Sequence, residues 1–357
     1  MVIVNHSVAI LSEANSGNIL KQNLSSIIEL EQITNEVWFD LLIIKEFELP
    51  QKHAGVGLAR KIGMDEALRR FSTIHKNGII ACFGADSTVQ ANYFTEILMA
   101  FKEGIYGCNI FFEHELEGTD HDINRAITDY ELFLRYYNLA LNYANIPYAH
   151  FTVGSSMAVS CEGYVKVGGM NKRKAGEDFY FLQKIIQLGN FKELTTTTVY
   201  PSARISDRVP FGTGKAISDY LQDLSVDYLT YSFLSFEILK DFVKNLRDED
   251  RTKWSTEIKG FLSHDFSNLL DRVKNNNKGE KKYQHGVFQL FNAFQVLKYL
   301  HYMRDKHARP VCLDKVVKQL LHELDNDLKV GEMTNKELLI LIREIDRTRK
   351  FRTKYIY

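Results

Sequence analysis

Apolar positions in the first half of the chain follow two different spacings, which predict strands separated by helices. Short apolar runs of strand length occupy Val2–Val4, Leu41–Phe47 and Gly78–Phe83. Apolar residues recur at helical spacing between them, over Leu20–Ile28 and Ala59–Phe71. Strands and helices that alternate in this way predict an α/β fold, with a parallel sheet that carries helices on both faces.

The same alternation continues and then gives way to helices. Asn109–Phe112 and Thr195–Tyr200 predict two more strands, and Thr128–Asn142 predicts a helix rich in Tyr and Leu. The remainder of the chain consists of helical patterns separated by charged loops. We therefore expect an α/β domain over residues 1–217 and an all-helical accessory region over residues 218–357.

Within the helical region, three local patterns stand out. Lys274–Lys282 is polar and charged, which is typical of a loop or linker. Thr334 and Glu337 have the spacing of a capping box that opens the last helix. One amphipathic stripe consists of Val287, Leu290, Phe291, Phe294 and Leu297.

Composition narrows the class of protein. Lys+Arg 45 equals Asp+Glu 45, so we expect no nucleic-acid partner. No apolar run approaches the ~20 residues that a transmembrane helix needs, and no signal peptide is recognisable. We expect a cytoplasmic protein without a transmembrane segment, and leave open contact with the inner face of a membrane. The cysteines lack metal-ligand spacing and predict buried free thiols: Cys82, Cys108, Cys161 and Cys312.

The segment from Gly154 to Gly189 carries the most informative pattern. Gly168-Gly169 is followed by a polar linker, by the acidic pair Glu177-Asp178 and by an amphipathic helix that ends at Gly189. The pair is therefore predicted at a helix N-terminus, where free backbone N–H groups stabilise carboxylates. Considered alone, the pair is compatible with simple helix capping.

This order of features resembles the acceptor side of family 2 glycosyltransferases with the GT-A fold. In that family the second acid is the general base, which takes a proton from the attacking acceptor hydroxyl. The resemblance implies that Asp178 is the base and that Glu177 orients the acceptor or caps the helix. It also implies that Gly154 lies near the donor sugar.

Three further segments match the family in order. Residues 54–67 resemble a Gly-rich turn that leads into a helix. Gly55 and Gly57 would let the backbone approach a ligand, and Arg60 and Lys61 would meet a phosphate or a base. Residues 78–90 match the place of the Asp-x-Asp motif, and here the triplet is Gly84-Ala85-Asp86. Ala85 and Asp86 would contact the donor, with Asp86 binding Mn²⁺ or Mg²⁺, although the first acid of the motif is missing.

The third segment, residues 200–215, follows the Thr-rich strand where the family contacts the donor diphosphate. Arg208 and Lys215, with Arg204 nearby, are the candidates to neutralise that diphosphate. The resemblance thus implies inverting, metal-assisted transfer from a nucleotide-diphosphate sugar, in this family more often a UDP-sugar, to the hydroxyl of a sugar or glycan acceptor.

The start of the chain departs from the family. Counting strands back from Asp86 aligns Val2–Asn5 with the family's second strand. Either a first strand–helix unit precedes this sequence, or the protein is a reduced form. Together with Gly84, this departure leaves an alternative open, a non-catalytic member of the fold that binds a sugar nucleotide or a protein partner.

Other interpretations rest on weaker patterns. Gly55–Lys61 faintly suggests the phosphate loop of a nucleotidyltransferase. The tyrosines of the helix at 128–142 either stack a sugar or pack in the core, and packing is the better interpretation. One charged stretch could form a second metal cluster, but a solvated loop is the better interpretation. Its residues are His114, Glu117, Asp120, His121 and Asp122.

Overall fold

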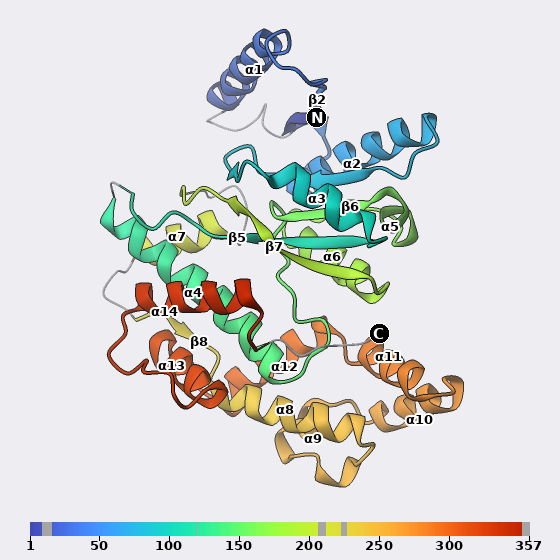
Figure 1. Cartoon of the computed structure of the whole chain (residues 1–357), viewed down its shortest axis with the longest axis vertical. Helices are drawn as coiled ribbons and strands as arrows, with labels where there is room; N and C mark the ends of the chain where they lie inside the picture. The colour runs from blue at the N-terminus through green and yellow to red at the C-terminus, as the bar shows by residue number, and fades with distance from the viewer. Residues whose placement is uncertain (9–15, 119, 206–211, 223–226, 352–357) are drawn as a thin grey trace. The chain divides into compact units, whose positions relative to one another are not determined.

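The protein has a mixed α/β fold, in which short strands are surrounded by many helices (Figure 1). The strands form a five-stranded sheet and two small two-stranded sheets. The computed structural model describes residues 1–8, 16–118, 120–205, 212–222 and 227–351.

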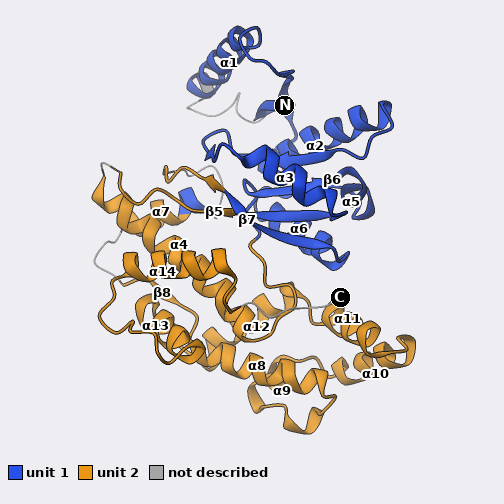
Figure 2. Cartoon of the chain, viewed as in Figure 1, with its two compact units in different colours: residues 1–110, 152–197, 206–215 blue, residues 111–151, 198–205, 216–357 orange. Residues whose placement is uncertain are grey.

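Two compact units divide the chain, and both are built from segments that are not continuous in sequence (Figure 2). The first contains residues 1–110, 152–197 and 206–215, and the second contains residues 111–151, 198–205 and 216–357. The predicted division at residue 217 lies close to residue 216, where the chain enters the second unit for the last time. The long helix α4 (His121–Tyr143) nevertheless belongs to the second unit, because it packs against α8, α13 and α14 of the helical region.

The first unit contains most of the predicted strand–helix alternation. A parallel pair, β1 and β2, forms a small sheet of its own, and helix α2 packs on β1 closely enough that a Cβ at Gly63 would lie 2.7 Å from Ile3 Cδ1. The elements that begin in this unit are β1 (Val2–Ser7), α1 (Ser16–Ile33), β2 (Ile43–Leu49), α2 (Val56–Thr73), β3 (Ile79–Cys82), β4 (Thr88–Val89), α3 (Tyr93–Lys102), β5 (Gly107–Phe112), β6 (Met157–Ser160), α5 (Cys161–Lys166), α6 (Glu177–Gln187), β7 (Phe191–Tyr200) and α7 (Thr213–Gln222).

The five-stranded sheet is mixed, so the expectation of a parallel sheet is wrong for this part. Its strand order is β3-β6-β5-β7-β4, and β6 runs antiparallel to both β3 and β5. Every residue of β5 and β6 is buried, which means that both faces of the sheet are covered there. The short run Met157–Ser160 carries no periodic signal, because a strand buried on both faces does not alternate apolar and polar positions.

The second unit is mostly helical, as the sequence predicts, with one short strand pair, β8 and β9, that the pattern does not reveal. Among the described residues, no helix is both long enough and apolar enough to cross a membrane. Besides α4, its elements are β8 (Leu229–Thr230), α8 (Phe233–Arg247), the 3-10 helix η2 (Arg251–Lys253), α9 (Thr256–Phe261), α10 (Phe266–Asn276), α11 (Glu280–Leu290), α12 (Ala293–Lys306), β9 (Val311–Cys312), α13 (Leu313–Leu324) and α14 (Asn335–Thr348).

Local side-chain chemistry sets the helix boundaries in this unit. The predicted capping box is confirmed, because Thr334 Oγ1 accepts from Glu337 N and Glu337 Oε2 accepts from Thr334 N. The apolar stripe of residues 287–297 is divided between two helices. The first helix ends at Leu290, and Asn292 caps the second by accepting hydrogen bonds from Phe294 N and Gln295 N.

A buried group of charges joins α4 to α14. The guanidinium of Arg135 is fully buried and donates to Glu131 Oε1 (2.8 Å), to Asp346 Oδ2 (2.6 Å) and to the carbonyl of Phe112. Arg343 of α14 also donates to both carboxylate oxygens of Glu131. Burial opposes ionisation of Glu131, but Arg135, His114 and Arg343 hold its pKa well below the ordinary value. This charged group therefore fixes the packing of α4 against α14.

Replacing Arg135 by Met should destabilise the second unit by about 3–5 kcal/mol, because Glu131 and Asp346 would lose a buried counter-ion. Urea unfolding followed by circular dichroism measures the change in midpoint. The exposed Arg69, which pairs with Glu66 on α2, provides the control, and Arg69→Met should leave the midpoint almost unchanged. Equal midpoints for both variants would contradict the structural role of Arg135.

Candidate functional site

The acidic pair opens helix α6, as predicted. Gly176 precedes the helix with φ 68°, a left-handed conformation that favours glycine, and Glu177 and Asp178 form the first turn. The loop before the helix is held by Asn171, whose side chain donates to the carbonyl of Glu177 (2.9 Å) and accepts from Arg173 N (3.1 Å). Gly189, at φ 75°, follows the helix. The boundaries predicted for this segment are confirmed.

Backbone N–H groups fix the carboxylate of Asp178. Its Oδ2 accepts from Gly154 N (2.8 Å), and its Oδ1 accepts from Phe179 N (2.8 Å). The first bond ties the N-terminus of α6 to the turn before β6. Gly154 and Asp178, both predicted site residues, are thus in direct contact.

Arg60 of α2 forms a short ion pair with Glu177, whose side chain is almost completely buried. The guanidinium also lies against Gly154, where a Cβ would overlap it. Four of the predicted residues, Arg60, Gly154, Glu177 and Asp178, therefore form one cluster. Arg60 was predicted to meet a phosphate or a base, and here its partner is a carboxylate of the chain itself.

Gly55 and Gly57 permit a close approach, but the neighbour is the chain's own backbone. A Cβ at Gly55 would lie 2.9 Å from Lys174 Cα, and one at Gly57 would overlap the carbonyl oxygen of Arg173. The expectation that these glycines let the backbone approach a ligand is therefore replaced by helix–loop packing. They allow the start of α2 to pack closely against the loop that leads into the acidic pair.

The turn after β3 lies beside this cluster. Ser87 N donates to the carbonyl of Gly84 (3.0 Å), which closes a turn with Ala85 and Asp86 exposed at its tip. A Cβ at Gly84 would lie 3.5 Å from the Cβ of Ser155, the neighbour of Gly154. Asp86, Ala85 and the acidic pair thus belong to adjoining segments.

The space at residue 84 does not admit the missing acid of the Asp-x-Asp motif without rearrangement. A Cβ there would lie 2.7 Å from Ser87 Oγ and 3.0 Å from Asp86 Oδ1. No group of three His, Cys, Asp or Glu side chains suited to a metal occurs in the described part of the chain. A single carboxylate fits Mg²⁺ or Mn²⁺ only when the substrate's phosphate oxygens complete the coordination.

The remaining predicted residues are Lys61, Lys215 and Arg208. Lys61 pairs with Asp65 (2.9 Å), which also accepts from Tyr164 OH (2.6 Å). Lys215 lies half-buried in the first turn of α7. Arg208 lies outside the described residues. The proposed diphosphate contacts from residues 200–215 therefore stay predictions.

Burial raises the pKa values of both acids in the cluster. Desolvation, opposed by Arg60 and reinforced by Asp178, raises the pKa of Glu177 to about 7. Desolvation also raises the pKa of Asp178, against the opposing effects of Arg60 and of the N–H groups of Phe179 and Gly154. A carboxylate with a raised pKa is a stronger base near neutral pH than an ordinary surface acid.

Sequence reasoning overlooked two polar residues of this site. Asn171 orients the loop before α6, and its position just after Gly168-Gly169 is the only signal that pointed to it. Ser87 Oγ is buried and has no hydrogen-bond partner among the described residues. Its place directly after Asp86 is a signal that could have included it.

The suggested second metal cluster is not formed. Asp120 caps α4 by accepting from Asp122 N and Ile123 N, and His114 is buried against Glu131. Glu117 pairs instead with Lys336. The tyrosine-rich helix is largely core, as expected, with Tyr136 fully buried.

No protein-family model matches this chain, and no curated protein sequence matches it.

A methyl group at residue 57 should be costly, because it would force the backbone of residue 173 away from α2. We expect Gly57→Ala to lower the free energy of unfolding by about 1–3 kcal/mol. Gly17 is the control, since its Cβ would meet nothing within 4 Å and Gly17→Ala should not lower the free energy of unfolding. Denaturant unfolding compares the two. A Gly57→Ala protein as stable as the parent would contradict the close packing.

The raised pKa of Glu177 makes a prediction about stability and pH. Folding favours the protonated acid, so the parent protein should lose stability relative to Glu177→Gln as pH rises from about 4.5 to about 7. Below that window both side chains are neutral, and above it the difference should be constant. Parallel stability curves for the two proteins across this window would show that Arg60 cancels the effect of burial.

Proposed function

We propose that the chain is a GT-A-like glycosyltransferase that moves a sugar from a nucleotide-diphosphate donor, most simply a UDP-sugar, to an acceptor hydroxyl with inversion. The observation that carries the proposal is the carboxylate of Asp178. It stands at a helix N-terminus, is oriented by Gly154 N and adjoins the segment that bears Asp86. This is the arrangement that the order of motifs predicts.

In the proposed reaction, Asp178 accepts the proton of the acceptor hydroxyl while that oxygen bonds to the anomeric carbon of the donor. The bond from the anomeric carbon to the diphosphate breaks, and the nucleotide diphosphate leaves with the electron pair. Burial favours this role, because it raises the pKa of Asp178 and so its basicity. Glu177 and Arg60 act as positioning residues.

Asp86 is the residue that would share a divalent cation with the donor diphosphate. Such a cation neutralises the charge of the leaving group. Asp86 lies exposed at the tip of the turn that begins at Gly84, where an incoming ligand can reach it. One carboxylate of the chain would then act together with the phosphate oxygens of the donor.

A second candidate function is favoured by the way the charged groups are used. Arg60 is paired with Glu177, and both oxygens of Asp178 accept backbone hydrogen bonds. In a non-catalytic protein of this fold that binds a sugar nucleotide or a protein partner, these charged groups would only hold the cluster together. The two functions differ in whether turnover accompanies donor binding.

Thermal unfolding with a panel of UDP-sugars and other sugar nucleotides, each with Mn²⁺, Mg²⁺ or chelator, tests donor binding. A donor at ten times its dissociation constant should raise the melting temperature by about 2–4 °C. Transfer is then assayed with that donor and simple sugar acceptors. No shift with any donor would contradict both candidate functions as nucleotide-sugar binders and leave only a protein partner.

Asp178→Asn should lower transfer by about 10²–10⁴-fold and keep the donor-dependent shift, since the amide cannot take up the proton. The matched control is Glu162→Gln, an exposed acid in the first turn of α5, which should keep both activities. Transfer at the parental rate by Asp178→Asn would eliminate Asp178 as the base. Donor binding without any transfer by the parent protein would establish the non-catalytic alternative.

A further inference from the structure

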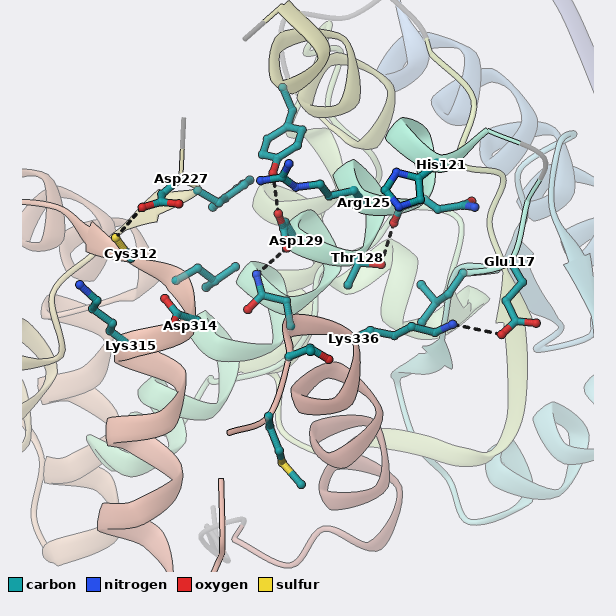
Figure 3. A pocket seen from close by; sticks show the side chains of 18 residues that line it. Glu117, His121, Arg125, Thr128, Asp129, Asp227, Cys312, Asp314, Lys315 and Lys336 are labelled. Carbon is teal, nitrogen blue, oxygen red and sulfur yellow. Dashed lines mark hydrogen bonds and ion pairs between the residues drawn. The ribbon is translucent and has the colours of Figure 1, made fainter. Parts of the chain in front are cut away.

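The second unit contains a cavity of about 770 Å³, within the roughly 300–1,000 Å³ that is usual for small-molecule sites (Figure 3). Its wall combines the N-terminal half of α4, Tyr220 of α7, residues 227–228, the start of α13 and residues 333–336 at the start of α14. All of these segments belong to the second unit. The proposed transfer site uses none of them.

Asp129 is the most strongly oriented polar group in this wall. Its side chain is 4% exposed, and one carboxylate oxygen accepts from Tyr220 OH (2.7 Å) while the other accepts from Asn335 Nδ2 (2.7 Å). A carboxylate can accept about four hydrogen bonds. Two partners from α7 and α14 thus fix the orientation of the group and leave acceptor capacity for a ligand.

The charges of the wall nearly balance. Three cations, Arg125, Lys315 and Lys336, face four carboxylates, and Lys336 already pairs with Glu117 (3.0 Å). Lys315 and Lys336 also lie on opposite sides of Asp129 in Figure 3, so they do not converge on one point. A phosphate or nucleotide is normally held by converging cations. This wall is suited to a ligand without net charge.

The other lining groups are hydrogen-bonding side chains and rings. Asn335 and Asp314 provide planar amide and carboxylate groups that can bond to neighbouring hydroxyls. Asn124 also lines the wall, but its amide oxygen and nitrogen both bond to the backbone of Gly118. The rings of Tyr220 and Tyr228, with centroids 6.0 Å apart, supply apolar surface beside them. Hydroxyl groups on a carbon skeleton match this mixture of acceptors, donors and aromatic surface.

We propose that this cavity binds a neutral, multiply hydroxylated small molecule, a monosaccharide or a related polyol, with Asp129 and Asp314 accepting hydrogen bonds from its hydroxyls. The site is distinct from the proposed transfer site and does not depend on transfer activity.

Saturation-transfer NMR on the full chain tests the site with glucose, galactose, mannose, N-acetylglucosamine and myo-inositol. Inorganic phosphate and glucose 6-phosphate are the anionic probes. At least one neutral probe should bind, and titration should show affinity about tenfold weaker in Asp129→Asn. Asp314→Asn, which keeps the side-chain volume at the more accessible start of α13, should also weaken binding and decides the matter if Asp129→Asn does not fold.

Glu344→Gln is the matched control, because Glu344 is an exposed acid on α14 that does not line the cavity. The Glu344→Gln protein should bind the same neutral probe with the affinity of the parent protein. The proposal is overturned if no neutral probe binds, if only the anionic probes bind, or if Asp314→Asn binds as the parent does. Loss of sugar binding in Asp178→Asn, with the two cavity variants unaffected, would place the sugar in the first unit and also overturn it.

Discussion

The first unit depends on burying two adjacent carboxylates at the start of α6. Burial of an acid is unfavourable unless hydrogen bonds or an opposite charge compensate it. Glu177 is compensated by Arg60, and Asp178 by the N–H groups of Gly154 and Phe179. These contacts bring α2, α6 and the turn before β6 together, so the arrangement of three elements follows from one electrostatic requirement.

The same requirement explains why the candidate site admits two functions. Arg60 is positioned to balance Glu177, so its charge is already used when no ligand is bound. In a transferase, this ion pair would hold the start of α6, and with it Asp178, in position for proton transfer. In a protein without turnover, the pair would simply hold α2 against α6.

Local signals in the sequence were sufficient for much of the fold and for part of the site. The apolar spacing after Asp178 and the capping pair Thr334 and Glu337 are patterns of residues three or four positions apart. The helix predicted from the first and the capping box predicted from the second are confirmed. The antiparallel strand β6 and the placement of α4 with the helical region depend on contacts between distant segments. The role of Gly57 was misjudged for the same reason, since its neighbour, Arg173, is remote in sequence.

A raised pKa does not by itself distinguish a chemical role from a structural one. Burial, opposed by Arg135, raises the pKa of Asp346 to about 6, and that carboxylate lies wholly inside the second unit. A substrate cannot reach it, so its titration affects only stability. Asp178 also has a raised pKa, but it is only partly buried and adjoins the exposed turn at Asp86. Access to solvent, more than basicity, makes Asp178 the better candidate for proton transfer.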